Sequence, residues 1–440
     1  MTTLISEKMK TVTLKDLGKN RKFSSTESAI FDKMTKLGFP NRKTEAWRYL
    51  NLDTLLQTEF RSPSSKITLS SELRESIERH FIQSDVHSHL VFLNGVYEPA
   101  LSSNYLPEGS FIKPISVVKT ENPELLQDCY ASKSTQDQSN VFAYLNELES
   151  QSAVVLYIRE GVRIEESLHL IFASLDSEAA PFLYHPRMIV ILEREASAKI
   201  VLNYLGFTEQ KCLINSSVDL FLGERTNLNF VLLQRGSNHS QQFLNARAFL
   251  KESSNLKWIS FAHDCGTTRN EARVYLEGAK ASCSMQGLSL LENSTQVFHH
   301  ASCLHQAPET RSTQLYKNIL SGNSVAEFNS LAHVFREGQK ANSYQLNRNL
   351  LLSEGARVYS RPQLKIYADD VQCSHGSATG QLEEDELFYL RSRGFSRESA
   401  KYMITYGFAE EVIAGIEPLS LRLQIERLVD HELQELTKNL

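Results

Sequence analysis

Two residues that ligate metals and clusters lie one residue apart near the end of the chain. Cys373 and His375 follow Asp369 and Asp370 within the segment 362–380, whose first part alternates apolar and polar residues. That alternation predicts an extended strand, and side chains at i and i+2 of a strand point to the same face. The thiol and the imidazole can therefore converge on one zinc ion or iron–sulfur cluster. Two ligands are only half of such a site.

Composition limits the kind of protein that carries this segment. The chain has 440 residues, a formal net charge of −5, 41% hydrophobic residues and 22% charged residues. Nothing in this charge or its distribution favours nucleic acid or a membrane surface as a partner. The longest aliphatic stretches, such as 188–192, are strand-sized, and no secretory signal is expected. The six cysteines include no C-x-x-C pair, which indicates reduced thiols in a cytoplasmic compartment.

A repeat of short strands fills the middle of the chain. Polar corners begin at Leu192, Leu222, Leu250 and Leu276, at intervals of 30, 28 and 26 residues, and further corners follow to about residue 356. An apolar residue, a tight polar turn and a new strand at this spacing are typical of stacked coils. A β-sandwich would need hairpin turns every 8 to 12 residues, and the Asn-Gly and Asp-Gly signals for them are missing here.

The predicted fold class is therefore mostly β, a right-handed parallel β-helix core flanked by helical regions. We expect three domains. They are an N-terminal helical and mixed domain over 1–150, the β-helix core over 151–380 and a C-terminal helical domain over 381–440.

The N-terminal region mixes helix and strand signals. Apolar residues at helical spacing predict a helix over 28–37 that ends at Gly38. Trp47, in the run 43–50, is expected to be a structural anchor in the core. Asn94-Gly95 predicts a hairpin.

The C-terminal region has helical periodicity. A first helix with acids in its first turn ends near Gly394, and Ser396 caps a second helix. A third helix is expected over about 419–436. Ala400, Met403, Ile404 and Phe408 are expected to line one stripe of the second helix. Such helices either cap the open end of a repeat or dock a partner.

A second group of potential ligands lies inside the repeat. His299, Cys303 and His305 fall on one face if their strand is straight. Metal binding is one interpretation, and ordinary positions on a solvated face of the β-helix are the favoured one, because zinc sites usually recruit ligands from separate elements.

Several catalytic signatures are absent from the sequence. There is no phosphate-binding G-x-x-x-x-G-K-[ST] loop, no G-x-S-x-G, no H-E-x-x-H and no dinucleotide fingerprint. A β-helix carbohydrate enzyme would need a cluster of carboxylates or arginines in a long groove, and none is visible. Without a phosphate-binding loop, the chain is not expected to hydrolyse nucleotide by itself.

Three motifs together resemble one known family. Tyr367-Ala-Asp-Asp-Val-Gln-Cys-Ser-His-Gly, Phe388-Tyr-Leu-Arg-Ser-Arg-Gly and Lys43-Thr-Glu-Ala-Trp-Arg-Tyr look like the SufB/SufD family of iron–sulfur cluster assembly scaffold proteins. The resemblance covers essentially the whole chain. Cys-Ser-His-Gly followed directly by an acidic helix is similar to the SufD-like members.

The resemblance implies a non-catalytic scaffold subunit of a SUF-type complex. It implies pairing with a SufB-like chain through the β-helix and docking of a SufC-like ATPase on the C-terminal helices. A transient iron–sulfur cluster would be shared at the interface, with His375 as a metal ligand and Cys373 in the matching thiol position. Asp369 and Asp370 also match the family motif, and the resemblance leaves two roles open for them: structural residues of a turn, or ligands. The alternative is a purely structural module that holds ATPase subunits without binding iron, and the isolated chain could form a homodimer.

Overall fold

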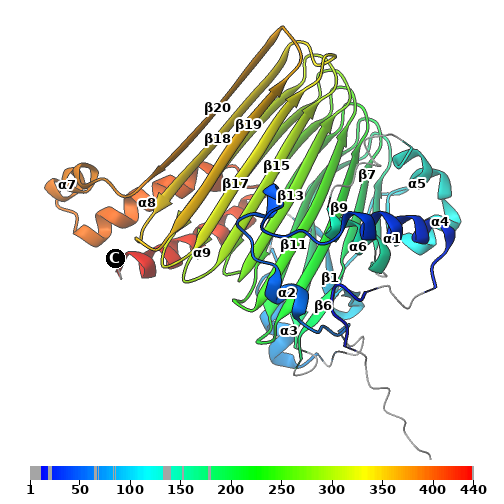
Figure 1. Cartoon of the computed structure of the whole chain (residues 1–440), viewed down its shortest axis with the longest axis horizontal. Coiled ribbons are helices and arrows are strands. Elements are labelled where there is room, and N and C mark those ends of the chain that lie inside the picture. Colours follow the sequence, from blue (N-terminus) through cyan, green and yellow to red (C-terminus); the bar gives the residue numbers. More distant parts are fainter. Residues whose placement is uncertain are drawn as a thin grey trace, which may run out of the picture.

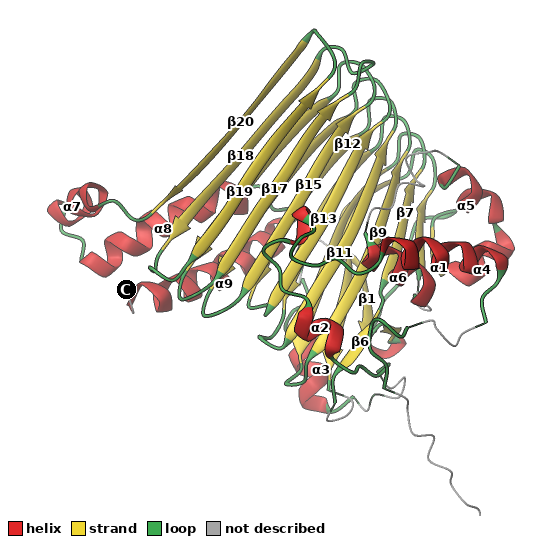
Figure 2. Cartoon of the chain, in the orientation of Figure 1, coloured by secondary structure: helices red, strands yellow, loops and turns green. Residues whose placement is uncertain are grey.

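The computed structural model describes residues 11–17, 22–63, 67, 69–82, 84, 86–131, 140–150, 153–176 and 180–438. Two long sheets face each other and form a β-solenoid, with helices at both ends of the sequence (Figure 1, Figure 2). The predicted mostly-β fold class with flanking helices is confirmed.

Each coil of the solenoid contributes one strand to each sheet. The first sheet contains, in spatial order, β2 (Val96–Tyr97), β1 (Val86–Leu93), β5 (Arg163–Leu175), β8 (Ser197–Phe207), β10 (Asn227–Arg235), β12 (Asn255–His263), β14 (Ser282–Leu291), β16 (Arg311–Leu320), β18 (Ala341–Leu351) and β20 (Val371–Gly380). The second contains β19 (Arg357–Ile366), β17 (Val325–Val334), β15 (Gln296–His305), β13 (Thr267–Leu276), β11 (Ser240–Leu250), β9 (Cys212–Leu222), β7 (Arg187–Leu192), β4 (Val154–Ile158) and β3 (Phe111–Pro114), and β6 (Phe182–Tyr184) pairs with β9.

The stacked turns explain the repeat seen in the sequence. The polar corners that the spacing predicted lie between consecutive strands, so that prediction is confirmed. Glu195 and Arg225 adopt left-handed φ angles of 62° and 54°, and Ser253, Lys280, Glu309 and Lys340 do the same in later coils. Each of these N–H groups donates to a carbonyl in the turn of the next coil; Arg225, for example, donates to Glu252 O at 2.9 Å. The register therefore repeats from coil to coil.

The solenoid interior is the main core. Buried aliphatic and aromatic residues from both sheets, from Leu90 to Phe328, pack into one continuous cluster. Burial of this apolar surface holds the two sheets together. Strands in the first coils, such as β9, are buried on both faces because helices also cover their outer sides.

The N-terminal helices mostly cover the outer face of the second sheet, but the helix Ser71–Glu78 lies on the first sheet, where Ile77 packs with Val91 and Ile171. The N-terminal helices are α1 (Ser25–Leu37), α2 (Asp53–Gln57), α3 (Ser71–Glu78), α4 (Ile115–Glu121), α5 (Pro123–Cys129) and α6 (Val141–Glu149), with short 3-10 turns at Glu45–Trp47 and Pro99–Leu101. As predicted, α1 ends at Gly38, Trp47 is buried, and Asn94-Gly95 forms the β1–β2 hairpin. β1 also pairs with β5, so part of the N-terminal region extends the core sheet, and the division at residue 150 stays a prediction.

The C-terminal helices are α7 (Glu384–Ser392), α8 (Arg397–Ile413) and α9 (Leu419–Lys438). The helices α8 and α9 lie on the outer face of the first sheet, where Ile413 and Ile425 pack against Ile259. They therefore cover a sheet face, so of the two alternatives the cap over the open end of the solenoid is not what α8 and α9 form. Among the described residues, no helix is long and apolar enough to cross a membrane.

One detail of the α8 prediction was also wrong. Met403 is 41% exposed, whereas Ala400, Thr405 and Ala409 are buried against the solenoid. The buried stripe is therefore offset from the predicted one. The polar Thr405 is accommodated because its hydroxyl donates to the Lys401 carbonyl at 2.8 Å.

Candidate functional site

The predicted metal ligands lie on the last coil of the solenoid. β20 pairs only with β18, and β19 pairs only with β17, so each is the terminal strand of its sheet in the part of the chain that the structure describes (Figure 1). A terminal strand leaves a row of backbone N–H and C=O groups without partners in the sheet. The candidate site is therefore also a free sheet edge.

The register places both ligands on rows that face the solenoid interior. Cys373 lies beside Ser343, and His375 lies beside Gln345, and both neighbours are buried. In the described part of the chain no further coil follows β20 to cover Cys373 and His375. His375 is consequently exposed, whereas Cys373 is half-buried against the end of the core.

The opposite strand of the last coil closes over part of this end. Ser377 Oγ donates to Ser360 Oγ at 2.8 Å, which joins β20 to β19 across the coil. Burial raises the pKa of the Cys373 thiol above its ordinary value, and a backbone hydrogen bond at Ser343 offsets only part of that. The thiol is therefore protonated at neutral pH, and metal binding must displace its proton.

The two carboxylates are at the turn that precedes β20. Asp369 and Asp370 are exposed, and the Asp370 main chain closes the column of stacked turns, accepting from Lys340 N–H at 2.6 Å and donating to Gln339 Oε1 at 3.2 Å. Asp370 is five residues from His375, about 16 Å along a strand. The structure therefore separates the carboxylates from the imidazole.

The second predicted group of ligands faces the solenoid interior. His299, Cys303 and His305 do lie on one face of β15, but they are buried, so the interpretation as a solvated face was wrong. His305 contacts the hydroxyls of Thr310 and Ser312, each at 2.8 Å, which occupies both ring nitrogens. Burial lowers the pKa of His299 to about 3 and that of His305 to about 4, so both rings are neutral.

No complete metal site is formed within the described ranges. Among those residues, no group of three or more His, Cys, Asp or Glu side chains could hold a metal ion. Cys373 and His375 stay a pair of candidate ligands on an exposed edge.

A second exposed surface lies on the helix that projects from the body of the molecule. Phe388 and Tyr389 on α7 are 71% and 57% exposed, and Phe395 follows in the loop to α8 (Figure 1). Arg397 of α8 holds α7 in place through a two-pronged contact with Glu384, at 2.7 and 3.3 Å. Exposed aromatic residues of this kind, on a helix that an ion pair fixes in position, mark an interaction surface.

The N-terminal segment reaches the last coil, which the sequence did not reveal. The rings of Tyr49 and Tyr359 stack at 3.7 Å, and Arg361 donates to Glu45 at 2.9 Å. The Arg269 guanidinium lies 3.6 Å from the centre of the Trp47 ring. The run 43–50 was singled out in the sequence, but nothing in it identified strand β19 as the partner.

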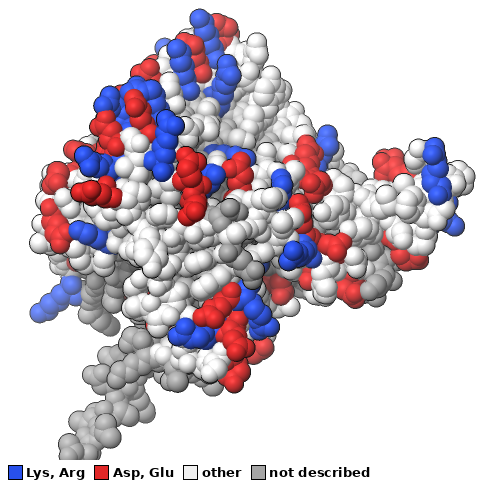
Figure 3. Space-filling view, turned by 180° about the vertical axis from the view of Figure 1, so that it is seen from behind, with Lys and Arg blue, Asp and Glu red and all other residues white. Residues whose placement is uncertain are grey.

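The charged surface has no extended patch of one sign on the face seen in Figure 3. Lysines and arginines there are interspersed with acids (Figure 3). At the coil corners the charges form ion pairs, such as the exposed pair of Arg225 with Glu195 at 2.9 Å and the partly buried pair of Lys251 with Glu277 at 2.8 Å. This distribution does not resemble a nucleic-acid-binding surface.

Comparison with known proteins identifies relatives along the whole chain. Residues 174–408 match the SUF system FeS cluster assembly, SufBD core domain, and residues 12–170 match the SufBD protein N-terminal region. An iron–sulfur cluster assembly SufBD family protein of Synechocystis is 27% identical, with 92% of each chain covered. The iron–sulfur cluster assembly protein SufD of Escherichia coli is also 27% identical, with 89% of each chain covered. The chloroplastic protein ABCI7 of Arabidopsis thaliana is 26% identical over 88% of this chain and 81% of its own.

Proposed function

This chain belongs to the SufBD family of iron–sulfur cluster assembly proteins, and we propose that it is a non-catalytic, SufD-like scaffold subunit of a cytoplasmic SUF complex. In this proposal the last coil pairs with a SufB-like chain, and the nascent cluster is shared between the two. The cluster is the cargo of the complex, held transiently and passed on.

The observation that carries the proposal is the placement of Cys373 and His375 on an edge strand. A ligand pair that lies on an open edge and is incomplete among the described residues is what a shared site requires from each partner. Both sheets end at this coil, so a second solenoid can continue them through main-chain hydrogen bonds. Exposed Ile366 and Tyr367 beside this edge add apolar surface for the contact.

The aromatic surface of α7 supports docking of a SufC-like ATPase. Phe388 and Tyr389 project away from the solenoid, and α8 is anchored to the core by Lys317, which donates to the Phe408 carbonyl at 2.9 Å and pairs with Glu411. A movement of the docked ATPase would therefore be transmitted to the first sheet. All six cysteines are free thiols, which fits a reducing compartment.

The experiment is to replace His375 with Ala in the co-expressed complex and to measure iron and sulfide after anaerobic purification. We expect cluster content to fall at least fivefold while the complex stays assembled. His431→Ala is the matched control, because that imidazole is also exposed but lies on α9.

An unchanged cluster content in His375→Ala would favour the alternative. In that case the chain would be a purely structural module that positions ATPase subunits and binds no iron. The two functions are distinguished by His375. A cluster-binding scaffold requires both His375 and α7, whereas a structural module requires α7 alone.

A further inference from the structure

The described part of the chain contains a cavity that neither the last coil nor α7 contributes to. Its volume is about 410 Å³, and it lies where the N-terminal segment crosses the turns of four successive coils. This volume is within the range of small-molecule sites. The lining residues come from α2 and the segment after it, and from the turns β8–β9, β10–β11, β12–β13 and β14–β15.

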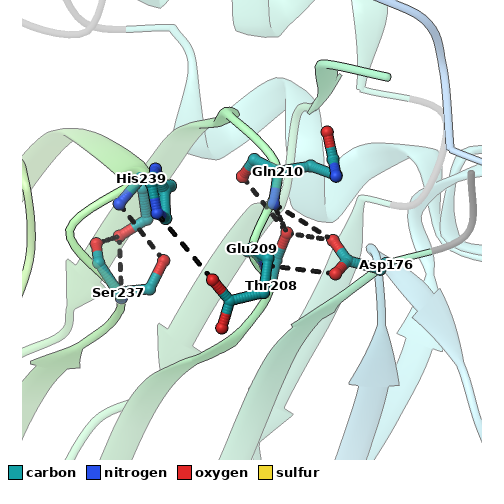
Figure 4. Close-up of polar contacts among 7 residues, drawn as sticks. Asp176, Thr208, Glu209, Gln210, Ser237 and His239 are labelled. Atoms are coloured by element: carbon teal, nitrogen blue, oxygen red, sulfur yellow. Dashed lines mark hydrogen bonds and ion pairs between the residues drawn. The ribbon is translucent and has the colours of Figure 1, made fainter. Parts of the chain in front are cut away.

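The turns that form the cavity are fixed by their own hydrogen bonds. The Asp176 carboxylate accepts from the Thr208 hydroxyl and from the N–H groups of Glu209, at 3.1 Å, and Gln210, at 3.4 Å (Figure 4). In the next coil Ser240 N–H donates to the Ser237 carbonyl at 2.9 Å. The cavity is therefore preformed, which lowers the entropic cost of binding.

The lining of the cavity favours a negatively charged ligand. No lining residue is Asp or Glu, and Lys211 and His239 are the lining residues that can carry a positive charge. The Glu209 carboxylate lies 3.9 Å from His239 Nε2, and the Glu209 side chain is 89% exposed (Figure 4). Because the Glu209 side chain is so exposed, it can move away from His239, and an anionic ligand can replace it.

The remaining lining is suited to a molecule with several hydroxyl groups. Hydroxyl side chains from α2 and from the turns surround the cavity, together with the amides of Asn238 and Asn293. Gln241 Oε1 is buried there and accepts no hydrogen bond from the residues that the structure describes, so it is available to accept one from a ligand. Leu55 and Phe60 supply an apolar wall.

We propose that this cavity binds a small phosphorylated, hydroxyl-rich molecule of the monosaccharide phosphate class. Lys211 and His239 contact the phosphate, since lysine binds phosphate as a point charge. The hydroxyl and amide groups hold the sugar, with Gln241 Oε1 accepting from one of its hydroxyls. This site is independent of cluster assembly, and its failure would leave the proposed function untouched.

The test is isothermal titration of the full chain with ribose 5-phosphate and glucose 6-phosphate, and separately with ribose and inorganic phosphate. We expect at least one sugar phosphate to bind tenfold more tightly than ribose or phosphate alone. Lys211→Met should weaken that binding at least tenfold, whereas Lys280→Met, an equal loss of charge at a different corner, should leave it unchanged. Glu209→Gln should strengthen it, because the competing carboxylate is removed.

Three outcomes would overturn the proposal. One is that neither sugar phosphate binds. Another is that inorganic phosphate binds as tightly as both, which would indicate an adventitious ion only. The third is an equal loss of affinity in Lys211→Met and Lys280→Met. If Lys211→Met lowers the melting temperature, His239→Gln provides the same test.

Discussion

Gln345 and His375 are neighbours in one parallel ladder, yet Gln345 is 2% exposed and His375 is exposed. The difference arises because β20 covers Gln345, whereas no strand in the described part of the chain covers His375. The imidazole therefore occupies a position that is interior in every other coil. A partner that continues the solenoid would bury His375 as β20 buries Gln345.

The apolar surface beside the last coil should control pairing with the SufB-like chain. Tyr367 is 54% exposed, and we expect Tyr367→Asp to weaken heterodimer formation at least tenfold, because a carboxylate would have to be desolvated in the interface. Analytical ultracentrifugation of the purified pair measures this. Tyr105→Asp is the control, since Tyr105 is 68% exposed and lies far along the chain from the last coil. Equal effects of the two substitutions would show that Tyr367 is not part of the interface.

The aromatic residues on α7 should control binding of the ATPase. Phe388→Asp removes the most exposed of the large apolar side chains in the described part of the chain, and we expect at least tenfold weaker binding of the SufC-like subunit in a pull-down with purified proteins. Leu37→Asp is the control, because Leu37 is an exposed apolar residue at the end of another helix. Retention of the ATPase by Phe388→Asp would contradict the assignment of this surface.

A buried ion network should set part of the acid stability of the fold. Asp219 contacts Arg187 at 3.2 Å, Arg247 at 2.8 Å and the Tyr130 hydroxyl at 2.7 Å. Burial by itself raises the pKa of Asp219, but the two arginines and the hydrogen bonds from Arg247 and Tyr130 bring it below its ordinary value. A lowered carboxyl pKa stabilises the fold above the unfolded-state pKa, and this contribution is lost as the pH falls through the native value.

Asp219→Asn should therefore destabilise the chain by about 3 to 5 kcal/mol at pH 7, the cost of leaving a buried charge without its partner. The difference from the unsubstituted chain should narrow below about pH 4. Urea unfolding at several pH values measures both the loss of stability at pH 7 and its decrease at low pH. Glu195→Gln, which breaks an exposed pair with Arg225, should cost about 0 to 1 kcal/mol. A pH-independent difference for Asp219→Asn would argue against the ionic explanation.

Local patterns in the sequence were enough to predict the coils and several helix ends. Repeated corners after Leu192 and Leu222 predicted the turns, because an identical turn in each coil requires the same short polar segment. Gly38 marked the end of α1 and Ser396 the start of α8, because the residues that cap helix ends are chosen by local backbone geometry and hydrogen bonding.

Long-range packing could not be predicted in the same way. The direction in which His299 faces depends on which side of β15 meets the other sheet, and alternation alone does not decide that. The stack of Tyr49 on Tyr359 joins residues more than 300 positions apart, with no sequence pattern to connect them. For Cys373 and His375, strand alternation predicted the shared face, and only the ladder with Ser343 and Gln345 identifies it as the inner one.

Ligation of the cluster by His375 is the central step of the proposed function. The measurement is pulsed electron paramagnetic resonance of the reduced, cluster-loaded complex, in which this chain alone carries ¹⁵N-labelled histidine. We predict a ¹⁵N hyperfine coupling to the cluster that disappears in His375→Ala and persists in His431→Ala. A cluster signal with no ¹⁵N coupling in the labelled complex would contradict the account.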